Sequence, residues 1–324
     1  MDKERRPFQK NVLNHCYQRT IDGGVLFYSY SDYLVWFTIV CTMARRHQVQ
    51  ILAMCPMPDH VHISARANSL PDLSGFMRDY SHIFAGEHNP VCHRKGPLFE
   101  SPFGSAPKFT DKSVRSNLIY VGNNPVERKL SSKAEDYRWT FLAYAASDHP
   151  FSPKLVIRKA RWPLQQAVKE VKNQFNTGRH LTYAQLKRLF KPLTALECQQ
   201  LTDFIIATYN VIDYNAALQY FNSYENMLLA MHSTTGSEYD IKETYVGKSD
   251  VHYVSMANTV MKLLKPNDIH DILAYSIEKR LEVFRLLQKH TPALSKQIAK
   301  FLHLPYKQGP IDDMWEFEPS NGFY

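Results

Sequence analysis

Alternation of apolar and polar residues predicts four β-strands in the first third of the chain. Residues 48–55 (QVQILAMC) and 60–66 (HVHISAR) alternate with period two around the turn sequence PMPD, which predicts a β-hairpin. β-type composition predicts a strand over residues 11–20 that ends at the turn DGG, and residues 96–103 (GPLFESPF) can form another. On the 48–55 strand we expect one apolar face, made of Val49, Ile51, Ala53 and Cys55.

Apolar residues spaced three and four apart predict helices between these strands. One helix begins near Ser31, a second covers residues 69–89, and a third covers residues 110–124 and ends before Pro125. The predicted order is β-α-β-β-α-β followed by a helix, which is typical of a ferredoxin-like split βαβ arrangement.

The second half of the chain is predicted to be helical throughout. The fold class is therefore α+β, with a first, ferredoxin-like domain in residues 1–150 and an all-α domain in residues 151–324. A polar stretch indicates a further boundary near residues 233–250. Residues 278–305 look like the start of a helix-turn-helix, but two prolines and a glycine interrupt the expected recognition helix.

Composition favours a globular cytoplasmic protein. Hydrophobic residues make up 44% of the chain and charged residues 22%, which excludes a disordered chain. The first ten residues lack an apolar signal region, and the longest apolar run is too short to span a bilayer, so no membrane partner is expected. The cysteines lack any C-x-x-C spacing, which argues against a disulfide framework or a zinc ribbon; they are Cys16, Cys41, Cys55, Cys92 and Cys198.

Positive charge is concentrated in one segment. The chain carries a net charge of +8, and residues 151–200 alone hold ten Lys and Arg against two acids. Residues 201–250 hold two Lys against seven acids. Such a basic block predicts a surface that binds nucleic acid phosphates, although a solvated helical face would have the same composition. The candidate DNA contacts are Lys154, Arg158, Lys159, Arg161, Lys187, Arg188 and Lys191.

The sequence MPDHVHI, residues 57–63, places two histidines on one face of the second hairpin strand. Side chains at i and i+2 of a strand point the same way, so His60 and His62 project together while Val61 and Ile63 point into the core. Two neighbouring imidazoles can share a metal ion. The alternative is a pair of exposed histidines on an edge strand.

Tyr120 has polar neighbours on the third predicted helix. Its neighbours one turn away include Asn117, Asn123 and Asn124, whereas the apolar stripe of the helix lies elsewhere. We therefore expect an exposed phenol, and the amide oxygen of Asn124 on the same side is a suitable ligand for a hard metal ion. A surface tyrosine without a function remains the alternative. Tyr80 lies on an apolar stripe instead and is expected in the core.

Five motifs occur in the order HCYQRT, LFYSYSDY, CPMPDHVHI, IYVGNNPVERKL and EDYRWTFLAY. With this order and spacing, residues 8–145 resemble the single-tyrosine HUH transposases, and specifically the REP-associated tyrosine transposases of bacteria. The resemblance implies a ferredoxin-like domain that cleaves and rejoins single-stranded DNA beside hairpins, joining a tyrosine to the 5′-phosphate and leaving a free 3′-OH. It also implies a nucleoid-associated protein that is a monomer or a homodimer.

By position, the resemblance makes His60, His62 and Asn124 the ligands of Mg²⁺ or Mn²⁺ and Tyr120 the nucleophile. Asp59 departs from the family, in which Asn is common before the first histidine, and can place a carboxylate behind the metal ligands. Two other interpretations stay open: a domesticated protein that binds hairpin DNA or RNA without cleaving it, and an HUH relaxase or replication initiator. The flanking motifs fit the transposases better.

Overall fold

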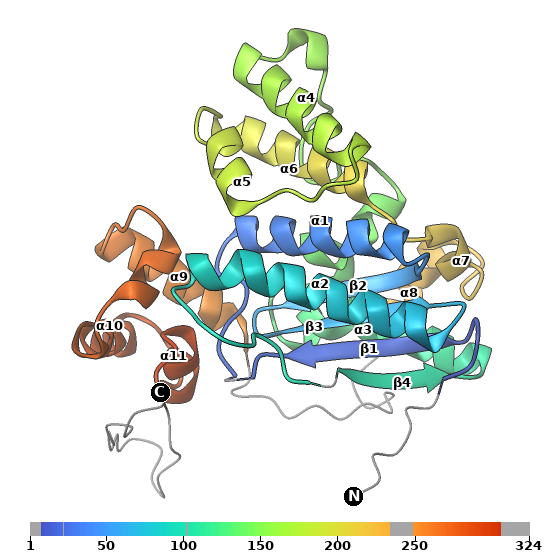
Figure 1. Cartoon of the computed structure of the whole chain (residues 1–324), viewed down its shortest axis with the longest axis horizontal. Helices are drawn as coiled ribbons and strands as arrows, with labels where there is room; N and C mark the ends of the chain where they lie inside the picture. The colour runs from blue at the N-terminus through green and yellow to red at the C-terminus, as the bar shows by residue number, and fades with distance from the viewer. Residues whose placement is uncertain (1–7, 22, 102, 234–248, 306–324) are drawn as a thin grey trace, which may run out of the picture.

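The computed structural model describes residues 8–305 except 22, 102 and 234–248, and its fold is α+β (Figure 1). Four antiparallel strands form one sheet in the order β2-β3-β1-β4. The predicted order β-α-β-β-α-β is confirmed. The strands are β1 Leu13–Arg19, β2 Gln50–Met57, β3 His60–Arg66 and β4 Gly104–Lys108. Helices α1 Tyr30–Arg46 and α2 Leu70–Val91 cover one face of the sheet, and α3 Asp111–Glu127 covers the other (Figure 1).

The β2-β3 hairpin divides its side chains between the two faces of the sheet. On β3, Val61 and Ile63 join the hydrophobic cluster under α1 and α2, as predicted. On β2, the expectation of a single apolar face is wrong, because the register shifts between Ile51 and Ala53. This bulge leaves Ile51 on the α1 side, whereas Cys55 lies on the α3 side.

Two further boundaries differ from the sequence prediction. The last strand lies at residues 104–108 rather than 96–103, because the backbone of residues 104–108 pairs with that of β1. The sequence GSAPK has low β-propensity, but a Cβ at Gly104 would overlap the ring of Tyr17, so glycine permits the close pairing. Helix α3 continues through Pro125 to Glu127. Pro125 removes one helical hydrogen bond, but the N–H groups of Arg128 and Leu130 still donate to the backbone oxygens of Asn124 and Pro125 and complete the last turn.

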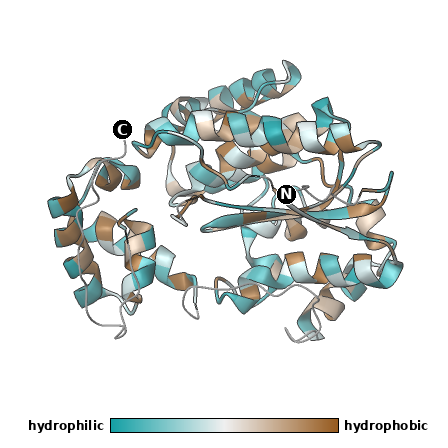
Figure 2. Ribbon diagram, turned by 60° about the horizontal axis from the view of Figure 1, so that its bottom comes forward, coloured by the Kyte–Doolittle hydropathy of each residue, from teal (hydrophilic) through white to brown (hydrophobic). Residues whose placement is uncertain are grey.

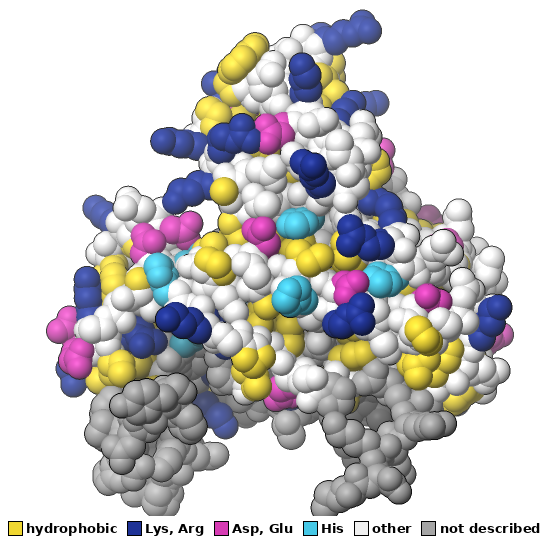
Figure 3. Space-filling view, in the orientation of Figure 1, with side chains coloured by type: hydrophobic (Ala, Val, Ile, Leu, Met, Phe, Trp, Pro, Cys, Tyr) yellow, Lys and Arg dark blue, Asp and Glu magenta, His cyan; other side chains and the backbone are white. Residues whose placement is uncertain are grey.

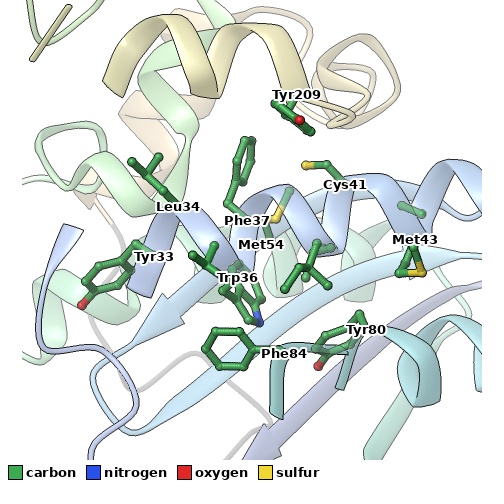
Figure 4. Packing of buried hydrophobic residues seen from close by; sticks show 14 of the residues in the cluster. Tyr33, Leu34, Trp36, Phe37, Cys41, Met43, Met54, Tyr80, Phe84 and Tyr209 are labelled. Carbon is green, nitrogen blue, oxygen red and sulfur yellow. The ribbon is translucent and has the colours of Figure 1, made fainter. Parts of the chain in front are cut away.

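Helix α1 lies at the centre of the molecule. Every residue from Asp32 to Ala44 is buried. Trp36 points towards Tyr80 on α2, while Phe37 points the opposite way, towards α6 (Figure 4). Each fully buried side chain of this kind contributes about 1.5–3 kcal/mol through the hydrophobic effect.

Three helices from the second half pack on the outer side of α1. They are α4 Trp162–Asn176, α5 Tyr183–Phe190 and α6 Ala195–Tyr209. Their buried residues belong to the same hydrophobic cluster as those of α1. The predicted domain boundary near residue 150 stays a prediction, because this shared cluster does not test whether each part folds alone.

The remaining helices cover the other sides of the sheet. Helices α7 Tyr214–Leu218 and α8 Tyr224–Ser233 pack on the outer side of α3. Helices α9 Val251–Leu263, α10 Ile277–His290 and α11 Ser295–Phe301 form a lobe with its own apolar cluster (Figure 2). The expected recognition helix and most of the boundary predicted at 233–250 lie outside the described residues.

Candidate active site between the sheet and helix α3

The predicted site residues come together on the α3 face of the sheet. The ring centroids of His60 and His62 are 4.8 Å apart, and those of His62 and Tyr120 are 5.5 Å apart. The amide nitrogen of Asn124 lies 3.2 Å from Nε2 of His62. All four side chains are buried. Strand parity and one helical turn therefore place two imidazoles, a phenol and an amide in a single cluster.

His15 is a member of the cluster that sequence analysis missed. It lies on β1, its ring stacks on that of His62 at 5.2 Å, and its Nε2 is 3.0 Å from Nδ1 of His62. The ring of Tyr120 meets it edge-on at 5.6 Å. The motif HCYQRT contains this histidine, but its place beside His62 becomes visible only when β1 is paired with β3.

Both proposed histidine ligands use Nδ1 in a hydrogen bond. Nδ1 of His62 pairs with His15, and Nδ1 of His60 lies 2.6 Å from Oδ1 of Asp59. If each Nδ1 carries the proton, Nε2 keeps its lone pair in both rings, which is the tautomer that binds a metal through Nε2. The donor contact from the Asn124 amide to Nε2 of His62 agrees with this assignment.

Burial and neighbouring charges set the protonation states of His62 and Asp59. Burial, together with the nearby His60 and Arg19, holds the pKa of His62 well below its usual value, so the ring is neutral at pH 7. Burial raises the pKa of Asp59, but the hydrogen bonds of His60 and Lys300 and the positive charge of Lys300 lower it by more. Asp59 is therefore a carboxylate, with Nζ of Lys300 2.6 Å from its Oδ2. Lys300 belongs to α11, and sequence analysis did not connect it with this site.

The residues present fit a divalent metal ion of the magnesium type. Oδ1 of Asn124 is buried and has no hydrogen-bond partner among the described residues. Rotating the amide would bring this oxygen to the position of the nitrogen, 3.2 Å from Nε2 of His62. Adjacent octahedral ligands of Mg²⁺ lie about 3 Å apart. Two imidazoles and an amide leave coordination positions for water or phosphate. Within the described ranges, no group of three His, Cys, Asp or Glu residues is arranged to hold a metal ion.

The expectation that Tyr120 is exposed is wrong, because only 1% of the residue is accessible. Helix α3 is enclosed between the sheet and α8, so its polar side is buried as well. Nδ2 of Asn123 donates to the backbone oxygen of Met231 on α8, and Gly122 lets the Met231 side chain approach. On the sheet side, Oγ of Ser64 donates to Oδ1 of Asn117 at 2.7 Å. The polar neighbours of Tyr120 thus form a buried hydrogen-bonded layer.

Tyr80 lies on the opposite side of the sheet and is fully buried, as predicted. Its hydroxyl donates to Oε1 of Gln18 on β1. This hydrogen bond satisfies the Tyr80 hydroxyl within the core, and the sheet separates Tyr80 from the histidine cluster.

The basic block is exposed but lies away from the histidine cluster. Its residues are on α4, α5 and the adjoining loops, beyond α1, whereas the cluster is on the α3 face (Figures 1 and 3). Arg161 pairs with Glu197, and Arg188 pairs with Glu170. The other five candidates are exposed and make no ion pair with a described residue: Lys154, Arg158, Lys159, Lys187 and Lys191.

Two further observations concern membrane-spanning helices and disulfide bonds. Among the described residues, no helix combines the length and the apolar character that crossing a membrane requires. All five cysteines are free thiols, and four of them are buried.

Comparison with known proteins gives limited information. No protein-family model matches the chain, and no curated protein matches it. Among solved structures, the chain is similar to a REP-associated tyrosine transposase bound to a REP hairpin, with 19% identity and a TM-score of 0.39. The match covers 45% of this chain and 87% of that chain. A likeness at this level does not assign the chain to a family.

Proposed function

We propose that this protein cleaves and rejoins single-stranded DNA beside hairpin sequences, with Tyr120 as the covalent nucleophile. The observation that carries the proposal is the convergence of His60, His62, Asn124 and Tyr120 in one buried cluster. The five ordered motifs in residues 8–145 support the same reaction, because they resemble those of REP-associated tyrosine transposases. The sheet order β2-β3-β1-β4 with α1 and α2 on one face supports a ferredoxin-like catalytic domain.

The reaction is a transesterification at phosphorus. The Oη atom of Tyr120 forms a bond to the phosphorus and gives up its proton, the bond to the 3′-oxygen breaks, and that oxygen takes up a proton. The 5′-phosphate is then held as a tyrosine ester, so a 3′-OH can reverse the step without an external energy source. A phenol with a pKa of about 10 is a weak nucleophile at neutral pH, so the phosphate itself must be activated.

A divalent ion held by His60, His62 and Asn124 would supply that activation by stabilising negative charge on the phosphate oxygens. The surrounding residues fix the ligands. His15 orients the ring of His62, and Asp59 orients the ring of His60. The reaction requires the site to open when DNA binds, because Tyr120 is buried.

The burial of Tyr120 favours a second candidate, a non-catalytic protein that recognises hairpin DNA. In this second candidate, the polar layer around Tyr120 stabilises the fold, and hairpin DNA binds at another surface of the protein. Covalent trapping separates the two candidates. The protein is incubated with Mg²⁺ and a library of labelled single-stranded hairpins, and adducts are recovered under denaturing conditions.

Wild-type protein should yield adducts, and Tyr120→Phe should yield none while still binding the same hairpins. Tyr17→Phe is the matched control, because Tyr17 lies on the same face of the sheet at 39% exposure. Hairpin binding without any adduct from the wild-type protein would support the non-catalytic candidate instead.

A further inference from the structure

A groove lies between α4 and the end of α5. It has a volume of about 800 Å³, and its lining combines Trp162 with charged, polar and apolar side chains, among them Lys169, Arg188, Glu170, Gln166 and Leu189. Trp162 is 71% exposed, more than any other exposed large hydrophobic residue in the described ranges. The groove therefore presents an aromatic ring to solvent among cationic and amide groups.

The fold does not require the ring of Trp162. Helix α4 packs through a buried stripe that includes Leu164, Val168 and Val171, and Trp162 lies outside this stripe. A single exposed apolar residue is normal by itself, so the case for binding rests on the groove beside the ring and on the charge around it. Apolar residues such as Ala167 and Leu189 form part of the groove beside Trp162, and Lys169 and Arg188 add positive charge to it.

The surroundings of the groove carry a large excess of positive charge. The two acids of residues 151–200 are paired, Glu197 with Arg161 and Glu170 with Arg188. The first turn of α4 contains no acid. Eight cations are exposed and make no ion pair with a described residue: Lys154, Arg158, Lys159, Lys169, Lys172, Arg179, Lys187 and Lys191. In Figure 3, Lys and Arg side chains project around helices α4 to α6.

We propose that this groove binds a segment of single-stranded DNA, with an unpaired base stacked on Trp162 and the phosphates neutralised by the surrounding lysines. The charge complements a polyanion, and the exposed ring selects a single strand, because bases in a duplex are already stacked on each other. The groove lies beyond α1 from the histidine cluster, so it is a second DNA site. Its binding depends on neither Tyr120 nor a metal ion.

Fluorescence anisotropy of a labelled 20-nucleotide oligo(dT) strand, measured with the full chain in EDTA, tests the stacking. Trp162→Ala should weaken binding roughly 5- to 150-fold, the range expected for losing one stacked base, and Trp162→Phe should restore most of it. Leu229→Ala is the matched control, because Leu229 is an apolar residue of α8 at 65% exposure. Unchanged thermal melting would show that each variant is folded.

The salt dependence of the same binding tests the charge. Replacing Lys169 and Lys191 with Gln should reduce the log–log slope by about 0.7 for each phosphate that is no longer neutralised, whereas Lys95→Gln should leave the slope unchanged. Tyr120→Phe should bind oligo(dT) as the wild type does, which separates this inference from the cleavage proposal. Equal oligo(dT) affinity for Trp162→Ala and wild type, or equal affinity of the wild type for duplex and single strand, would overturn the proposal.

Discussion

His62 is the residue whose surroundings limit its chemistry most. One nitrogen of its ring is occupied by His15 and the other faces Asn124, so the ring can neither turn nor gain a proton at low cost. His60 is fixed in the same way by Asp59. Orientation of this kind raises the affinity of a metal site because the ligands are already aligned before the ion arrives.

Asp59 should tune metal binding through His60. Asp59→Ala should weaken Mn²⁺ binding about 10- to 100-fold, because His60 loses the acceptor that fixes its ring. Asp59→Asn should have a smaller effect, because it keeps an acceptor oxygen and loses only the charge. Isothermal titration with Mn²⁺ measures both, and Asp111→Asn, an exposed acid at the start of α3, is the control. Equal affinities for all four proteins would remove Asp59 from the site.

Tyr80 should contribute to stability without a role in cleavage. Tyr80→Ala should cost roughly 3–5 kcal/mol of unfolding free energy, by analogy with other buried aromatic residues, because it leaves a cavity beside Trp36. Urea denaturation measures the change. A cost below about 1 kcal/mol would contradict the packing described here, and the exposed Tyr30 provides a control position for the same substitution.

At the scale of elements, sequence patterns predict four residues of the cluster, His60, His62, Tyr120 and Asn124, but neither His15 nor the burial of α3. Strand alternation placed His60 and His62 side by side, because parity in a strand is a local property. The bulge at Ile51 and the strand at Gly104 depend on pairing with other strands, which no local pattern contains. The expectation that Tyr120 is exposed is wrong because its ring packs against His15 and His62, and contacts with strands far away in sequence are not contained in a local pattern.

A buried ion pair joins two elements that are distant in sequence. Asp32 at the start of α1 lies 3.0 Å from Nε2 of His270, which belongs to the 3-10 helix Ile269–Ala274. Tyr183 on α5 donates to the same carboxylate at 2.7 Å. His270→Ala should destabilise the protein by roughly 3–5 kcal/mol, because it leaves a buried carboxylate without its counter-charge. Denaturation at pH 6 measures this, and a loss below about 1 kcal/mol would contradict it.

The same pair gives a pH dependence with a definite sign. Burial alone would lower the pKa of His270, but Asp32 and Asp268 raise it to about 10. Burial alone would raise the pKa of Asp32, but His270, His88 and Tyr183 lower it to about 2. The stabilisation from His270 is therefore full below pH 6.5 and lost as the pH rises through about 10. That from Asp32 is full above pH 3.8 and lost as the pH falls through about 2.

The difference in unfolding free energy between wild type and His270→Ala should thus be largest between about pH 4 and 6.5. It should shrink as the pH approaches 10. Denaturation series at several pH values give this difference directly. A difference that grows between pH 7 and 10 would contradict the assignment of a protonated His270.

At the scale of the whole molecule, α1 connects the sheet to the helices of the second half. Residues 1–150 alone should expose the outer face of α1, including Phe37 and Cys41, which the intact chain buries. We expect this fragment to melt at lower temperature than the full chain or to aggregate. Circular dichroism and analytical ultracentrifugation measure both properties. A fragment as stable as the full chain would show that the first 150 residues form an independent domain.

The excess of positive charge in residues 151–200 predicts a basic surface, and the structure places these residues, exposed, on α4, α5 and the adjoining loops. The sequence could not tell that this surface is separated from the histidine cluster by α1 and the sheet. The two proposals together predict that cleavage and strand binding can be impaired one at a time.

The most direct test of the cleavage proposal is to map the covalent bond. A hairpin adduct formed with Mg²⁺ is digested with protease, and the nucleotide-bearing peptide is identified by mass spectrometry. We predict one modified residue, Tyr120, and no adduct in Tyr120→Phe or in the His60→Ala, His62→Ala double variant. A nucleotide on any other residue, or hairpin binding without an adduct in the wild type, would contradict the proposal.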